Sequence, residues 1–211
     1  MLKAIIFDYG KVLTLPPTPE DWGRLAGVFG VGVEQLQQQY WGLRDKYDRA
    51  VYTGATYWQA VGEHLGKSIT QEDVTKLIAL DNTQWTRENP EMLDFAWRAK
   101  AAGLKIGILS NMQSDMLKAM REKLPWLERF DQQTYTCEVG AIKPEPESYF
   151  IVLHALDVKP AEAIFFDDKQ VNIDGALAVG MHAALFAGNM ATVIDAVKQL
   201  GVSLESQPVA R

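Results

Sequence analysis

Four segments of this chain place chemically reactive side chains directly after short apolar runs. Asp8 follows "AIIF", and Asp167 with Asp168 follows "AIFF". The segment "LKIGILSN" ends on Ser110 and Asn111, and "GAIKPEP" contains Lys143. Carboxylates can act as nucleophiles or proton carriers, while hydroxyl, amide and ammonium groups can hold and balance a charged ligand. These residues would form a reactive site if the fold brought them together.

The elements around these segments indicate how they could meet. The apolar runs are typical of strands covered by helices on both faces. Helical patterns occur between them, near 90–103, 115–123, 147–156, 171–179 and 190–199. This alternation predicts an α/β protein with a doubly wound, mostly parallel sheet. Ligands of such sheets bind at the carboxyl ends of the strands, so the reactive side chains are predicted to converge there.

Each of these features also has an ordinary structural explanation. Ser110 and Asn111 can simply cap a helix, and an Asp–Asp pair can simply form a turn. A lone lysine such as Lys143 is usually solvated. The functional interpretation gains weight because four separate turns must all deposit reactive groups on one edge of the sheet.

The interval from about 18 to 85 has a helical pattern throughout. We therefore predict an α/β core formed by residues 1–15 and 88–211, with residues 16–87 inserted as an all-helical cap. The connections at 14–19 and 84–91 are candidate hinges. One long cap helix is expected to present Leu36, Tyr40, Leu43, Tyr47 and Val51 on a single face. Most of the cap's aromatic cluster is expected to pack in its core, leaving one or two members for a substrate pocket: Trp41, Tyr47, Tyr52, Tyr57 and Trp58.

The composition narrows the class of protein. The chain has 211 residues, of which 47% are hydrophobic and 23% charged, as in an ordinary globular protein. A formal net charge of −6 disfavours nucleic acid as a partner. Cys137 is the single cysteine, and no apolar run is long enough to span a bilayer or to act as a signal peptide. We expect a cytoplasmic protein without membrane association and with an unstructured tail at 205–211; whether it is a monomer or a homodimer stays open.

The four segments, taken together, resemble the sequence motifs of the haloacid dehalogenase-like hydrolase superfamily. The matching stretches are "IIFDYGKVL", "ILSN", "AIKPEP" and "FFDD" followed by Asn172, in the family's order and across nearly the whole chain. The first motif is most similar to the phosphatase branch that reads F-D-x-G-x-V, and the helical insert resembles that family's small helical cap. The resemblance implies a hydrolase that acts on a small phosphorylated metabolite.

The resemblance also implies a role for each residue. Asp8 would attack phosphorus and form an aspartyl-phosphate that water then hydrolyses. Mg²⁺ would be held by Asp8, the backbone carbonyl of Gly10 and Asp168. Ser110, Asn111 and Lys143 would hold the phosphoryl oxygens, and Lys143 would also offset the charge of Asp8. The supporting residues would be Asp167 and Asn172, with Asn172 orienting Lys143 or Asp167.

The sequence departs from the family's pattern at Gly10. That position usually carries a second aspartate, which protonates the leaving oxygen and later activates water, a contribution of about 10²–10⁴ in rate. A substrate with a good leaving group, such as an acyl phosphate or a sugar 1-phosphate, would need less protonation. Alternatively, a cap residue or a water molecule could stand in, and four cap residues are candidates: Asp45, Asp48, Glu63 and His64. Lys11, also unusual at its position, is expected to face solvent.

Two further functions stay open at this level. A metal-independent 2-haloacid dehalogenase would use the same aspartate, and Tyr149, six residues after Lys143, fits that pattern as well. The paired Asp167 and Asp168 argue against it, because they would repel a carboxylate substrate in the absence of a cation. A catalytically weak or inactive regulatory protein that binds phosphorylated ligands is the other alternative, and Gly10 is its best support.

Overall fold

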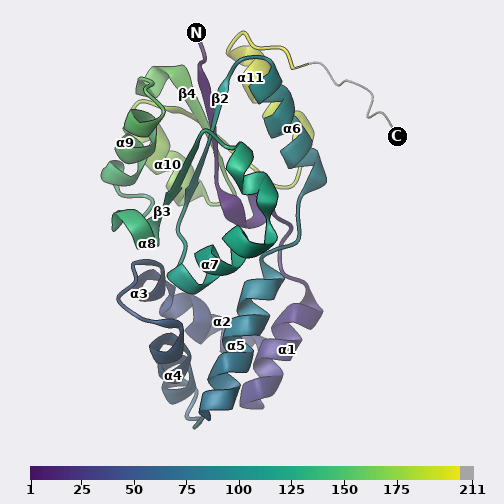
Figure 1. Cartoon of the computed structure of the whole chain (residues 1–211), viewed down its shortest axis with the longest axis vertical. Coiled ribbons are helices and arrows are strands. Elements are labelled where there is room, and N and C mark those ends of the chain that lie inside the picture. Colours follow the sequence, from purple (N-terminus) through teal and green to yellow (C-terminus); the bar gives the residue numbers. More distant parts are fainter. Residues whose placement is uncertain (205–211) are drawn as a thin grey trace.

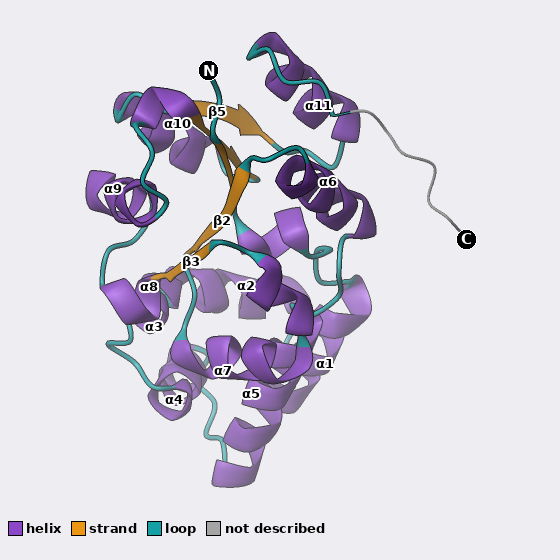
Figure 2. Ribbon diagram, turned by 45° about the horizontal axis from the view of Figure 1, so that its top comes forward, coloured by secondary structure: helices purple, strands orange, loops and turns teal. Residues whose placement is uncertain are grey.

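The centre of the molecule is a parallel β-sheet of five strands with helices on both faces (Figures 1 and 2). In this computed structural model, residues 1–204 are described, so the expected unstructured tail lies outside the described residues. The strands lie side by side in the order β3-β2-β1-β4-β5, and each neighbouring pair is parallel. The prediction of a doubly wound α/β fold is confirmed. The strand bounds are β1 Ala4–Phe7, β2 Lys105–Ser110, β3 Gln132–Tyr135, β4 Ala163–Asp167 and β5 His182–Leu185.

The two faces of the sheet bury alternate residues of each strand. Ile5 and Phe7 of β1 pack in one apolar cluster, while Ala4 and Ile6 pack in the other. Because both faces are covered, both alternating sets must be apolar, which explains the unbroken apolar run at 4–7. The first cluster includes helices α6 (Pro90–Ala101), α7 (Ser114–Lys123) and α11 (Met190–Gln199), and the second includes α9 (Pro146–Ala155) and α10 (Gln170–Ala178).

Five further helices lie below the carboxyl ends of the strands in Figure 1. They pack around an apolar cluster of their own, formed by residues between Trp22 and Leu77. Threonines at 18, 53 and 70 begin three of them with reciprocal capping contacts. The boundary of this cap at 16–87 stays a prediction. The bounds of the helices are α1 Pro19–Phe29, α2 Val33–Gly42, α3 Arg44–Asp48, α4 Gly54–His64 and α5 Gln71–Gln84.

The expectation of one long helix over 36–51 is wrong. Helix α2 ends at Gly42, and α3 starts after Leu43, whose ψ of −2° departs from helical geometry. Glycine is a weak helix former, so a break is cheap there. Ala50 then adopts a positive φ of 57°, and Val51 is 67% exposed. Two separate helices, α2 and the short α3, therefore replace the single predicted one.

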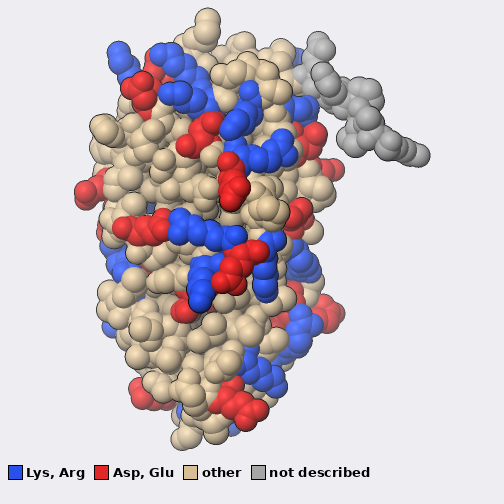
Figure 3. Space-filling view, viewed as in Figure 1, with Lys and Arg blue, Asp and Glu red and all other residues tan. Residues whose placement is uncertain are grey.

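The two predicted hinge segments lie side by side. The Leu15 amide donates to the Arg87 carbonyl at 2.7 Å, and the Asn89 amide donates to the Leu13 carbonyl at 2.9 Å. Short helical turns complete the chain: η1 Tyr9–Leu13, η2 Pro125–Arg129, α8 Thr136–Val139 and η3 Pro160–Glu162. Within residues 1–204, no helix has both the length and the apolar character needed to cross a membrane. On the face drawn in Figure 3, basic and acidic side chains are interleaved.

Candidate active site

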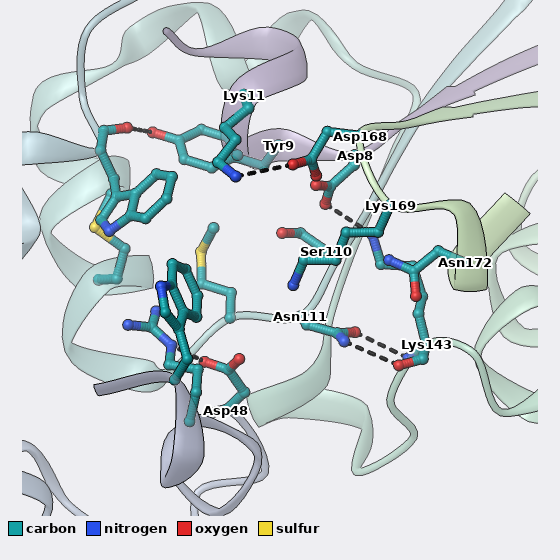
Figure 4. Close-up of a pocket in the computed structure, with 16 residues that line it drawn as sticks. Asp8, Tyr9, Lys11, Asp48, Ser110, Asn111, Lys143, Asp168, Lys169 and Asn172 are labelled. Carbon is teal, nitrogen blue, oxygen red and sulfur yellow. Dashed lines mark hydrogen bonds and ion pairs between the residues drawn. The ribbon is translucent and has the colours of Figure 1, made fainter. Parts of the chain in front are cut away.

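The carboxyl ends of the three central strands bring the predicted site residues together. Asp8 follows β1, while Ser110 and Asp167 are the last residues of β2 and β4, which flank β1 on either side. The Lys143 ammonium lies 2.7 Å from Asp8 Oδ1 and 2.6 Å from Asp167 Oδ2. Figure 4 shows Asp8, Ser110 and Lys143 around one cavity. The structure thus places the lysine between two carboxylates from adjacent strands.

Asn111 holds the backbone of Lys143 in place. Its side-chain oxygen accepts a hydrogen bond from the Lys143 amide at 2.9 Å, and its side-chain nitrogen donates to the Lys143 carbonyl at 3.0 Å. Both ends of the Asn111 side chain are therefore occupied with positioning the lysine. The backbone amide of Asn111 and the second hydrogen of its side-chain nitrogen are the donors left for the predicted phosphoryl contact. Ser110, which also lines the cavity, is 3% exposed.

Asp167 is buried completely and has both carboxylate oxygens bonded. Oδ1 accepts from the Lys169 amide at 2.8 Å, and the Asn172 side-chain nitrogen lies 3.0 Å from each oxygen. Lys143 occupies the other side of Oδ2. Tyr149 in turn donates to the Asn172 carbonyl at 2.7 Å. Asp167 therefore suits the supporting role predicted for it, and Asn172 orients Asp167 directly.

Burial and charge act against each other at the centre of the site. Burial raises the pKa of Asp8 to about 6, because the effect of burial and of the nearby carboxylates exceeds the opposing effect of the Lys143 charge. Burial disfavours the ammonium form of Lys143, but the adjacent Asp167 and Asp8 raise the pKa of Lys143 overall. Lys143 is therefore a permanent positive charge beside a carboxylate whose ionisation depends on its surroundings.

The donor set fits a hard divalent cation. Carboxylate oxygens of Asp8, Asp167 and Asp168 all lie within 4.8 Å of one another. Since both oxygens of Asp167 are engaged, Asp8 and Asp168 are the carboxylates left for a cation, and Gly10 lines the same cavity. The Lys11 ammonium lies 3.1 Å from Asp168 Oδ2, so the expectation that Lys11 merely faces solvent is wrong. The ammonium group of Lys11 thus contacts Asp168, one of the predicted metal ligands.

The cavity, together with the open space at its mouth, has about 600 Å³ of empty volume, and residues of the cap form part of its lining. Of the four candidates for the missing acid–base group, Asp48 lines it, whereas Asp45, Glu63 and His64 are absent from the lining formed by residues 1–204. The sequence did not single out six other lining residues, namely Tyr9, Arg44, Trp85, Met112, Met116 and Lys169. The spacing of Arg44 and Asp48, one helical turn apart, was the available signal for the cap's contribution.

The aromatic residues of the cap divide as predicted. Tyr47, Tyr57 and Trp58 are buried in the cap's apolar cluster, and Tyr52 packs against it. Trp41 is 39% exposed and lines the cavity, where the Lys169 ammonium lies 5.4 Å from the centre of its ring. One aromatic residue is thus free to contact a ligand.

A parallel sheet that carries a carboxylate, a lysine and a pair of aspartates at its strand ends is the arrangement of a doubly wound α/β enzyme. The description "haloacid dehalogenase-like hydrolase" fits residues 2–180, and the chain belongs to this family of hydrolases. The predicted family membership is confirmed.

Relatives in this family carry more than one activity. The chain is 26% identical over 199 residues to "Phosphatase MT3486" of Mycobacterium tuberculosis, covering 87% of each chain. It is 26% identical to "Phosphorylated carbohydrates phosphatase" of Thermotoga maritima, covering 86% of this chain and 83% of that one. It is also 29% identical to "(S)-2-haloacid dehalogenase" of Xanthobacter autotrophicus, covering 89% and 76%.

A solved structure has the same fold. The enzyme BT-2542 of the same family, from Bacteroides thetaiotaomicron, superposes with a TM-score of 0.71 at 22% identity, over 90% of this chain and 96% of that one. That structure is a complex with magnesium and inorganic phosphate.

Proposed function

We propose that the protein is a magnesium-dependent phosphatase that hydrolyses a small phosphorylated metabolite through an aspartyl-phosphate on Asp8. The observation that carries the proposal is the buried contact of the Lys143 ammonium with both Asp8 and Asp167. A carboxylate can attack a phosphate only when the negative charges of both are offset, and this lysine supplies part of that offset. The phosphatases among the relatives support the same conclusion.

The first step forms a bond between Asp8 and phosphorus. Asp8 Oδ1 accepts from Lys143, which leaves Oδ2 without a hydrogen bond from residues 1–204 and free to attack. The phosphorus–ester oxygen bond breaks, and the leaving oxygen departs as an anion or takes a proton from water. Ser110 and the backbone amide of Asn111 hold the phosphoryl oxygens, while Lys143 balances their charge. In the second step, water attacks phosphorus, releases inorganic phosphate and restores Asp8.

Asp8, Asp168 and the Gly10 carbonyl would hold Mg²⁺. When bound, Mg²⁺ withdraws electron density from the phosphoryl oxygens and offsets the repulsion between two anions. Asp167, with both oxygens bonded inside the protein, keeps Lys143 in place and is not required as a direct ligand. The complex of BT-2542 with magnesium and phosphate supports this assignment by analogy of fold.

The glycine at position 10 limits which phosphate esters can be good substrates. Without an acid at that position, the leaving oxygen must either be stable as an anion or receive its proton from water. A sugar 1-phosphate or an acyl phosphate meets the first condition better than an ordinary alkyl phosphate does. The phosphatase of phosphorylated carbohydrates among the relatives supports a sugar phosphate.

Dehalogenation is a second candidate, favoured by the 29% identity to a haloacid dehalogenase. That reaction needs no metal, and its substrate carries a carboxylate of its own. Asp167 and Asp168 beside Asp8 would repel such a substrate, and within residues 1–204 Lys143 and Lys11 are the only cations that pair with them directly. The cluster of three aspartates therefore favours the phosphatase.

One assay separates these functions. The purified protein is incubated with a panel of phosphate esters and with 2-chloropropionate, each with Mg²⁺ and with EDTA. The proposal expects phosphate release that needs Mg²⁺ and is lost in Asp8→Asn. Halide release that persists in EDTA would establish the dehalogenase instead. Tight binding of phosphate esters without any turnover would establish the regulatory alternative.

A further inference from the structure

The cap places a buried ion pair at the end of the cavity away from Asp8. Arg44 Nε lies 2.8 Å from Asp48 Oδ1, and the two residues are one turn apart along α3. Arg44 is 9% exposed and Asp48 is 5% exposed, yet both line the cavity. Figure 4 shows Asp48 across the open space from Asp8. A substrate whose phosphoryl group reaches Asp8 would extend its organic part toward this pair.

Each member of the pair keeps hydrogen-bonding capacity for a ligand. Arg44 donates through Nε to Asp48, through Nη1 to Tyr40 and Asp81, and through a further N–H to the Tyr57 hydroxyl. A guanidinium has five N–H donors, so one N–H of Nη2 is left for a ligand. Asp48 spends Oδ1 on Arg44, and nothing within residues 1–204 donates to Oδ2. Asp48 Oδ2 is not among the fully buried polar atoms without a partner, so this oxygen is accessible, and Arg44 also lines the cavity. A donor and an acceptor therefore lie ready at the cavity surface.

These two atoms match the chemistry of adjacent hydroxyl groups. One hydroxyl oxygen accepts from Arg44 Nη2, and the neighbouring hydroxyl donates to Asp48 Oδ2. Both bonds are charge-assisted and are therefore stronger than bonds between neutral groups. Burial raises the pKa of Asp48, whereas Arg44 and Lys169 favour its ionised form. The close contact with Arg44 supports the carboxylate as the acceptor.

The charges around this end of the cavity balance. Arg44 and Lys169 are positive, while Asp48 and Asp81 are negative. A second phosphate or a carboxylate on the substrate would find no excess of positive charge here. The exposed face of Trp41 offers an apolar surface on which a ring can pack. The environment thus favours an uncharged ring or chain that carries hydroxyls.

We infer that Arg44 and Asp48 form the subsite for the organic part of the substrate and select an uncharged group with adjacent hydroxyls, such as a sugar. The inference rests on the proposed phosphatase function for its site but is tested by binding alone. The lining of the cavity reaches from Asp8 to Arg44 and Asp48, so one ligand can contact both ends.

The test measures binding in Asp8→Asn protein, which cannot turn over its ligand. Titration calorimetry with Mg²⁺ compares a hexose 1-phosphate, cyclohexyl phosphate, 2-phosphoglycolate and inorganic phosphate. The hexose phosphate is expected to bind more tightly than cyclohexyl phosphate, which has a ring of the same size without ring hydroxyls. Adding Asp48→Asn is expected to weaken binding of the hexose phosphate about 10-fold, because a charged hydrogen bond is replaced by a neutral one. Binding of inorganic phosphate should stay the same.

Asp94→Asn is the matched control. Asp94 pairs with Arg98 at the same spacing and the same 2.8 Å distance, but on α6 and outside the cavity. If Asp48→Asn fails to fold, Arg44→Lys provides the same comparison. Equal weakening for the hexose phosphate and cyclohexyl phosphate would overturn the inference, as would tighter binding of 2-phosphoglycolate than of the hexose phosphate. Lack of turnover by the unmodified protein, with the binding pattern intact, would overturn only the proposed function.

Discussion

Gly10 lies against the indole ring of Trp85. A Cβ atom at position 10 would be 3.4 Å from Trp85 Cζ3 and 3.6 Å from Cε3, which are ordinary contact distances. The backbone of Gly10, with φ −69° and ψ 125°, is accessible to any residue. An aspartate is therefore compatible with this position, where its side chain would lie beside Trp85.

Replacing Gly10 by aspartate should restore a proton donor for the leaving oxygen. We expect Gly10→Asp to accelerate hydrolysis of alkyl phosphates about 10²-fold, the lower end of the usual effect of a general acid. Hydrolysis of p-nitrophenyl phosphate, whose leaving group needs no proton, should change little. Steady-state rates on both esters check the prediction. Gly10→Asn has nearly the same shape without the carboxyl group, and an equal acceleration by this variant would exclude proton donation.

Lys11 should compete with the metal for Asp168. Its ammonium lies 3.1 Å from Asp168 Oδ2, and its side chain is 39% exposed, so the pair is only partly shielded from water. Lys11→Met is expected to tighten Mg²⁺ binding by about two- to fivefold, in line with the modest energies of exposed ion pairs. Titration of the protein with Mg²⁺ measures the change. Lys3→Met, which removes a surface pair with Glu162, should leave Mg²⁺ affinity unaltered. Weaker Mg²⁺ binding in Lys11→Met would contradict the competition.

Asp8 should lower stability while it enables catalysis. Burial raises its pKa from 3.8 to about 6. Above pH 6 the carboxyl group is ionised in the folded protein, although its buried surroundings disfavour the charge. This shift corresponds to a cost of about 3 kcal/mol at most. Asp8→Asn is expected to abolish turnover and to raise the free energy of unfolding at pH 7.5 by about 1–3 kcal/mol, because the charge is removed. Denaturant titration in EDTA gives the measurement.

The pH dependence of this gain in the free energy of unfolding tests whether the charge of Asp8 causes it. The advantage of Asp8→Asn should be complete above pH 6 and should shrink as the pH falls toward 3.8, where the carboxyl group is protonated in both folded and unfolded chains. Asp167→Asn is the contrasting variant. Asp167 accepts from Lys143, Asn172 and the Lys169 amide, so its replacement should destabilise the protein. A gain that does not vary with pH would point to a cause other than the charge of Asp8.

The residues at the strand ends could be predicted because the signal is local. The strands that end at Asp8, Ser110 and Asp167 are marked by apolar runs, and in a parallel sheet such runs end at the same edge. Asp8, Ser110 and Asp167 follow from that geometry alone. The role of Asn111 in clamping the Lys143 backbone did not follow, because it depends on contacts between residues 32 positions apart.

The contribution of the cap was harder to predict. The helical pattern at 36–51 is continuous in apolar spacing, and the break at Leu43 reflects a preference of only about 1 kcal/mol at Gly42. Which side chains of α3 reach the cavity depends on that break and on packing against the core. Arg44 and Asp48 therefore read as an ordinary pair on a helix until the fold places them opposite Asp8.

Asp115, at the start of α7, should hold the cap against the core. Its Oδ2 accepts from the Tyr47 hydroxyl and from the Gly54 amide, both at 3.0 Å, and its carbonyl accepts from Asn82 at 3.3 Å. We expect Asp115→Ala to lower the free energy of unfolding by about 1–3 kcal/mol, because two buried donors lose their acceptor. Hydrogen exchange at the Gly54 amide should accelerate.

Glu145→Gln provides the comparison for this prediction. Glu145 pairs with Arg49 of the cap across the same junction, but both side chains are substantially exposed, and such pairs contribute less than about 1 kcal/mol. If the cap is held mainly through Asp115, hydrogen exchange in α3 and α4 should increase in Asp115→Ala and remain near the original rate in Glu145→Gln. The opposite order would show that the exposed pair, and not the contacts of Asp115, determines how firmly the cap is attached.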